Sequence, residues 1–115
     1  MTASPEDTND ALVAAERILL RALCHGGAAR PLRSEIFQRA EGHAFREAAH
    51  QIVFRELREI GLHGSPGLQP HLAARLTRLG FPDIDVQELF AGAAPTEAEI
   101  RVALDRLAAA RPAKT

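Results

Sequence analysis

Hydrophobic residues recur along this chain at intervals of three and four, which is the spacing of one face of an α-helix. The clearest case is the segment 45–60, where apolar residues share one face and charged residues fill the opposite one. Its apolar face comprises Phe45, Ala48, Ala49, Ile52, Val53, Leu57 and Ile60. No segment alternates apolar and polar residues with a period of two, so the pattern predicts helices without a sheet.

The same spacing predicts six helices, separated by glycine and proline breaks. The expected ranges are 4–24, 31–40, 45–60 and 69–79, then a short helix starting at Asp83 or Asp85 and a last helix starting at Thr96. Asp85 and Glu88, like Thr96 and Glu99, have the spacing of a capping box. Because only a few residues join the last two helices, they are expected to form an antiparallel hairpin.

The chain has 115 residues, which is enough for one hydrophobic core and too few for two. Leucine and alanine dominate its hydrophobic residues, a composition that favours helix over strand. The fold class predicted is therefore all-α: one compact six-helix bundle over 1–115, ending in a helical hairpin. Its ordered core is expected at about 5–111, between short flexible termini.

Charge and cysteine content narrow the function classes. The chain carries 14 basic and 15 acidic residues, so it lacks the basic excess that strong direct nucleic-acid binding requires. Cys24 is the only cysteine, which excludes an intramolecular disulfide. The first residues lack the features of a signal peptide, and the longest apolar run is far too short for a membrane span. A cytoplasmic protein without membrane contact is expected.

The sequence offers little chemistry for catalysis. Its histidines are His25, His43, His50, His63 and His71. No two of them are four residues apart, and no HExxH motif occurs. We therefore predict no catalytic residue, no cofactor and no metal site, although convergence of His63 and His71 with a carboxylate stays open. Phe54 has two interpretations, namely packing against a neighbouring helix or serving as an exposed anchor for a partner.

One stretch resembles a known family. Phe45 is followed five residues later by His50 and then by Val53 and Phe54, which is similar to a helix in the N-terminal domain of the DnaB-type replicative helicase. That family usually has isoleucine where Val53 stands. Segments 15–20, 64–66, 72–76 and 94–96 resemble other parts of the same domain, in the same order. Segment 16–23 is closer to the related C-terminal helicase-binding domain of the DnaG-type primase.

The resemblance implies a protein–protein interaction module without enzyme activity, which binds a replicative helicase or a related replication partner. The residues that carry the resemblance, namely Phe45, His50, Val53 and Phe54, are expected to be structural. Ile52 and Leu57 are expected to be structural because they lie on the apolar face of the same helix. We expect the N–H of His50 to bond a neighbouring helix end or loop carbonyl, because a half-buried imidazole must satisfy its donor.

The partner surface is predicted on the terminal hairpin. Phe90 would be its apolar anchor, and Arg101, Asp105 and Arg106 would form a polar rim around it. The simpler alternative is that Phe90 only completes the core. Two other function classes remain as alternatives: a small helical enzyme using His43, His50 or His63, and a DNA-binding regulator with a helix-turn-helix.

Overall fold

The described residues form six α-helices and no strand, which confirms the predicted all-α fold. The structure is a computed structural model that describes residues 5–25, 30–43, 45–60 and 67–110. In chain order the helices are α1 (Pro5–His25), α2 (Arg30–Ala40), α3 (Ala48–Ile60), α4 (Leu68–Arg78), α5 (Val86–Phe90) and α6 (Glu97–Ala110). Residues 1–4, 26–29, 44, 61–66 and 111–115, which include the expected start of the first helix and parts of the expected glycine and proline breaks, lie outside the described residues.

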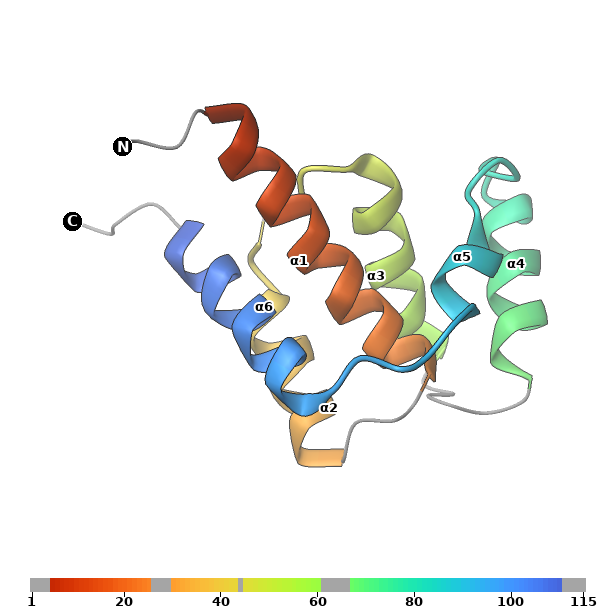
Figure 1. The fold of residues 1–115 in the computed structure, drawn as a ribbon. Coiled ribbons are helices and arrows are strands. Elements are labelled where there is room, and N and C mark those ends of the chain that lie inside the picture. The colour runs from red at the N-terminus through yellow and green to blue at the C-terminus, as the bar shows by residue number, and fades with distance from the viewer. Residues whose placement is uncertain (1–4, 26–29, 44, 61–66, 111–115) are drawn as a thin grey trace.

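The long helix α1 is the element on which the others assemble (Figure 1). Helix α6 runs antiparallel along one side of α1, while α3 and α5 pack against it elsewhere. Helix α2 packs on α6, and α4 packs on α3 and α5, so neither of these outer helices depends mainly on α1. A helix with packing partners on several sides needs a wide apolar surface, and α1 has one.

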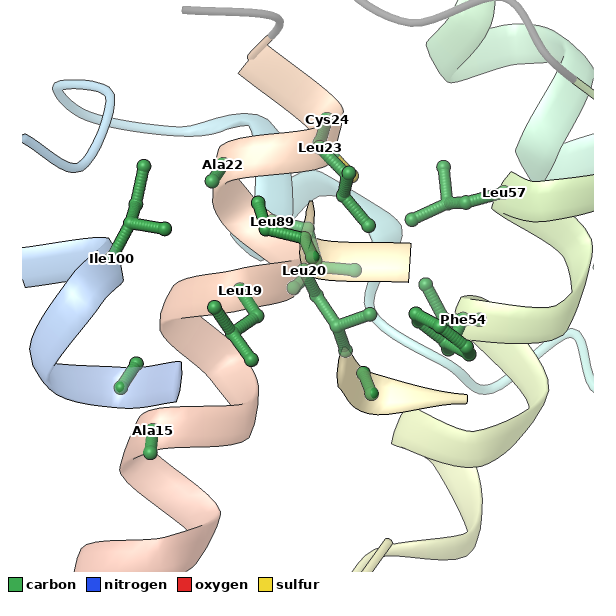
Figure 2. Packing of buried hydrophobic residues seen from close by; sticks show 14 of the residues in the cluster. Ala15, Leu19, Leu20, Ala22, Leu23, Cys24, Phe54, Leu57, Leu89 and Ile100 are labelled. Atoms are coloured by element: carbon green, nitrogen blue, oxygen red, sulfur yellow. The ribbon is translucent and has the colours of Figure 1, made fainter. Parts of the chain in front are cut away.

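Leucines of α1 form the centre of the core. Five apolar residues at helical spacing on α1 are all buried, namely Leu12, Ala15, Leu19, Ala22 and Leu23. Figure 2 shows Phe54 and Leu57 of α3 pointing toward Leu20 and Leu23 of α1. Because these side chains come from helices far apart in the sequence, their burial holds the bundle together.

Helix α3 begins at Ala48, three residues later than the hydrophobic pattern predicts. The reason is that the backbone just before Ala48 is hydrogen-bonded to α1. The N–H of Arg46 donates to the side chain of Glu16 in α1, at 2.9 Å. The helical hydrogen bonds of α3 begin with the N–H of Gln51, which donates to the carbonyl of Glu47. Residues 45–47 therefore anchor the start of α3 to α1 and are not part of the helix.

Side-chain caps fix where the last two helices begin. Asp85, and not Asp83, caps α5, because its carboxylate accepts the N–H of Glu88 at 3.2 Å. Thr96 and Glu99 form the predicted capping box, in which each side chain accepts the backbone N–H of the other. These contacts satisfy backbone donors that the first turn of a helix leaves unpaired.

The predicted hairpin of the last two helices is wrong. Helix α5 packs on α1 and α4, whereas α6 packs on α1 and α2, so the two helices lie on different sides of the bundle (Figure 1). The linker between them is extended at Ala91, with ψ of 155°. An extended residue spans about 3.3 Å, so even a short linker reaches across the end of α1. A short connection therefore did not make neighbours of the two helices.

Arg21 of α1 holds this linker in place. Its guanidinium donates to the carbonyl oxygens of Glu88, Ala91 and Ala93, at 2.8, 2.7 and 2.9 Å. Between the last two of these residues the backbone passes through Gly92, whose φ of +73° favours glycine. One side chain thus satisfies three carbonyls that no helix or sheet pairs.

We expect Arg21→Met to lower the free energy of unfolding by about 1–2 kcal/mol, because methionine keeps the aliphatic stem and loses the three hydrogen bonds. Amide hydrogen exchange in segment 91–95 should also become faster. Arg17→Met is the matched control, since among the described residues Arg17 makes one exposed ion pair, with Glu88 at 3.4 Å, and no hydrogen bond to a backbone carbonyl. Such pairs contribute about 0–1 kcal/mol. Equal losses in urea unfolding of both variants would contradict the role of Arg21.

Candidate functional site

A carboxylate lies fully buried in the middle of α1. The side chain of Glu16 has no exposed surface, and three donors surround its two oxygens. Nε2 of His43 is 2.7 Å from Oε2, and the N–H of Arg46 donates to the same oxygen. Nδ1 of His50 is 3.1 Å from Oε1. Burying a charge is costly unless it is hydrogen-bonded, and here three residues between positions 43 and 50 supply the bonds.

The network keeps Glu16 ionised. Burial by itself raises the pKa of this carboxyl, but the hydrogen bonds from His50, His43 and the Arg46 N–H outweigh it and hold the pKa below its ordinary value of 4.5. An ionised carboxylate only accepts hydrogen bonds. His43 therefore donates through Nε2 and His50 through Nδ1, which fixes a different proton position on each ring.

Aromatic packing positions His43. The ring of His43 meets Phe45 edge-on, with centroids 4.9 Å apart. Phe45 in turn lies 5.2 Å from Phe54, and Phe54 lies 5.5 Å from Phe37 of α2. Phe54 is only 4% exposed, so the packing interpretation of this residue is confirmed and the exposed-anchor interpretation is wrong.

A cleft of about 330 Å³ opens beside His50. Its walls come from α1, α3, α5 and the loop between α4 and α5. The polar lining residues are Arg17, His50, Asp83, Asp85 and Glu88, and the others are Ala49, Val53, Gly80, Phe81, Ile84 and Leu89. Glu16 does not line the cleft, so the imidazole of His50 stands between the buried carboxylate and this opening.

A second hollow of about 420 Å³ is a groove between α1 and α6. It is lined by Ala11, Ala14, Ala15 and Ile18 of α1, and by Ala98, Glu99, Val102, Ala103 and Arg106 of α6. Apart from Glu99 and Arg106, every lining side chain is apolar. Val102, which lines this groove, is 53% exposed.

The structure separates the four residues of the predicted interface. Phe90 is half-buried against the core, which agrees with the simpler alternative that it only completes the core. Arg101 pairs with Glu97 and with Glu35 of α2, at 3.0 and 3.5 Å. Of the four, only Arg106 lines the groove, and Phe90 lies on a helix that packs elsewhere.

Asp105 also faces α2, where its carboxylate is 3.5 Å from the guanidinium of Arg39. Arg39 pairs with Glu35 as well, at 3.2 Å. One side of α6, with Arg101 and Asp105, therefore forms ion pairs with α2. Another side, with Arg106, lines the groove. Arg101, Asp105 and Arg106 therefore do not form the polar rim around Phe90 that the hairpin prediction required.

The motif residues of α3 are structural, with two corrections. Val53 and Leu57 are buried, but Ile52 is only partly buried. His50 is largely buried and hydrogen-bonded, as predicted, but its partner is the Glu16 carboxylate and not a carbonyl. An ionised carboxylate is a stronger hydrogen-bond acceptor than a carbonyl oxygen. The carboxylate of Glu16 faces His50 across the interface between α1 and α3.

The sequence reasoning missed the buried polar residues. Glu16 occupies a core position of α1, four residues after Leu12 and three before Leu19. This spacing is the feature of the sequence that could have identified Glu16 as buried. Glu56 of α3 is likewise buried, and its carboxylate accepts from Nε of Arg75 of α4 at 2.6 Å. Two helix contacts, α1 with α3 and α3 with α4, therefore contain a carboxylate where the pattern predicted only apolar packing.

The other residues that could support catalysis or metal binding are two histidines, His63 and His71, and the thiol of Cys24. His71 is exposed on α4, and His63 lies outside the described residues. Within the described ranges, no three His, Cys, Asp or Glu side chains are arranged to share a metal ion. Cys24 is buried, and burial raises the pKa of its thiol to about 12, which suppresses the reactive thiolate. No helix in the described part of the chain is long and apolar enough to cross a bilayer.

Comparison with protein-family models, with curated proteins and with solved structures finds no match for this chain.

Proposed function

We propose that this chain is a non-catalytic protein-binding module, and that it binds a helix of its partner in the groove between α1 and α6. The observation that carries the proposal is the groove itself, a hollow lined by small apolar side chains with Val102 exposed at its wall. An open apolar surface on a small domain is typical of an interaction site.

The shape of the groove fits an α-helix. Two antiparallel helices form its walls, and five of its lining residues are alanines. Small side chains let another helix approach closely, and its larger side chains then fill the space between the walls. A partner with apolar residues at intervals of three and four would place them against Ile18 and Val102.

Opposite charges mark the two ends of the groove. Glu99 and Arg106 both line the groove from α6, and because they are seven residues apart on this helix they lie toward opposite ends of the groove. A bound helix is therefore favoured when it has an acidic residue near Arg106 and a basic residue near Glu99. Such charges select the partner's orientation more than they add affinity.

The sequence resemblance supports a partner in DNA replication. Segments of this chain resemble the helicase-binding domain of the DnaG-type primase and the N-terminal domain of the DnaB-type helicase. We therefore propose that the partner is the N-terminal ring of a replicative helicase or a related replication protein, in the cytoplasm. The six-helix fold and the buried positions of Val53, Phe54 and Leu57 are compatible with this assignment.

The test is calorimetric titration of the full chain into a replicative helicase from the same cell. We expect saturable binding that disappears when the N-terminal domain of the helicase is removed. Binding that persists without this domain would contradict the proposed location on the helicase. No binding to either form would reject the replication assignment.

A further inference from the structure

His50 has one ring nitrogen engaged and one available. Nδ1 donates to the buried carboxylate of Glu16, which orients the ring. Nε2 has no hydrogen-bond partner among the described residues, and the ring lines the cleft between α3 and α5. Because Nδ1 holds the proton, neutral His50 presents a lone pair at Nε2. In this neutral form the ring carries a hydrogen-bond acceptor where it lines the cavity.

The walls of this cleft are acidic. Asp83, Asp85 and Glu88 contribute three carboxylates, and Arg17 contributes one positive charge, which lies 3.4 Å from Glu88. Asp85 accepts the N–H of Glu88, and Asp83 has no ion-pair partner among the described residues. The cleft therefore combines an oriented acceptor with an excess of negative charge, and both features favour a ligand that carries N–H donors and a positive charge.

Apolar side chains complete the cleft. Val53 of α3, Ile84 of the loop and Leu89 of α5 line it together with Phe81, which is 42% exposed. A volume of about 330 Å³ lies at the small end of the range for ligand sites. A short aliphatic chain would contact these side chains while its charged end lay near His50 and Asp83.

We propose that this cleft binds a primary ammonium group on an aliphatic chain, carried either by a free amine or by a lysine side chain. In the bound complex the ammonium donates to Nε2 of His50 and lies beside the carboxylate of Asp83. The aliphatic chain packs on Ile84 and Leu89. This site is separate from the groove between α1 and α6, so it goes beyond the proposed function and does not depend on it.

The first test compares three ligands of one chain length by NMR titration of the full protein: 1-aminopentane, 1-pentanol and pentanoate. We expect the amine to shift the signals of His50 and of residues 83–89 with a dissociation constant in about the millimolar range, which is typical of so small a ligand. Pentanol should bind at least about fivefold more weakly, because it lacks the charge. Equal binding of the amine and pentanol, or no shifts with the amine, would overturn the proposal.

A pair of charge-matched variants locates the site. Asp83→Asn should weaken amine binding at least about fivefold, since the carboxylate lies in the wall of the cleft. Glu59→Gln removes the same charge from an exposed position of α3 outside the cleft, and it should leave the affinity unchanged. Both residues are exposed, so both variants are expected to fold. Equal affinity in the two variants would place the amine elsewhere.

The source of the ammonium is distinguished by a capped lysine, N-acetyl-lysine methylamide, in the same titration. If the capped lysine and 1-aminopentane both bind, the cleft accepts a lysine of a partner protein. If only 1-aminopentane binds, the ligand is a free amine. Failure of both would overturn the proposal, and because the groove is elsewhere, this result would leave helicase binding untouched.

Discussion

Replacing Glu16 with leucine is expected to lower the free energy of unfolding by about 3–5 kcal/mol, the usual cost of removing one partner from a buried charged network. Leucine has a similar size, so the loss does not come from a cavity. It comes from the donors of His43, His50 and the Arg46 backbone, which would be buried without an acceptor. Urea unfolding followed by circular dichroism measures this loss.

Glu59→Leu is the matched control for this substitution, because Glu59 is exposed on α3 and outside the network. Its stability should stay within about 0.5 kcal/mol of wild type. A Glu16→Leu variant as stable as Glu59→Leu would mean that the buried network contributes nothing to folding.

The Glu16 contribution should also depend on pH. The folded-state pKa lies below the unfolded-state value, so between the two the unfolded chain binds more protons. The contribution is therefore complete above the unfolded-state value, near 4.5, and is lost as the pH falls through the folded-state pKa. The stability difference between wild type and Glu16→Gln should narrow over this acidic range. A difference that widens on acidification would contradict the sign of the shift.

Leu57→Ala is expected to cost about 2–5 kcal/mol, the range for truncating a fully buried leucine. The side chain of Leu57 has no exposed surface, and it points from α3 toward the leucines of α1 (Figure 2). Truncation removes these contacts and leaves a cavity between the two helices. The midpoint of urea unfolding should fall while the slope of the transition stays constant.

Ile52→Ala on the same helix is the matched comparison. The apolar pattern assigns Ile52 and Leu57 to one face, but Ile52 is only partly buried. Its truncation should therefore cost clearly less than that of Leu57, because less apolar surface returns to water. Equal losses, or two variants that melt like wild type, would contradict the packing of α3.

Periodicity predicted the helices well because burial of one face is what makes each of them stable. The stripe of α1 from Leu12 to Leu23 is buried as its spacing requires, and the capping box at the start of α6 forms as its sequence pattern predicts. At the start of α5 only the Asp85 half of the predicted capping box forms. These features depend on residues close together in the chain, where spacing alone carries the information.

Features that depend on distant residues were less predictable. Glu16 finds donors 27 to 34 residues away, and no local pattern identifies them. Arg21 directs the linker after α5 across the end of α1, so a short connection did not make a hairpin. The groove lies between α1 and α6, which are at opposite ends of the sequence, and it replaces the surface that was predicted around Phe90.

The groove is tested most directly by two arginine substitutions at equally exposed apolar residues. Val102 lies in the wall of the groove, whereas Leu79 follows α4 outside the groove, and each is 53% exposed. Binding of each variant to the N-terminal ring of the replicative helicase is measured by calorimetry, with circular dichroism to confirm folding. We expect Val102→Arg to reduce affinity at least about tenfold, since a buried charge at a helix contact is costly, and Leu79→Arg to bind like wild type. Unchanged binding by a folded Val102→Arg variant would contradict the assignment of this groove as the binding site.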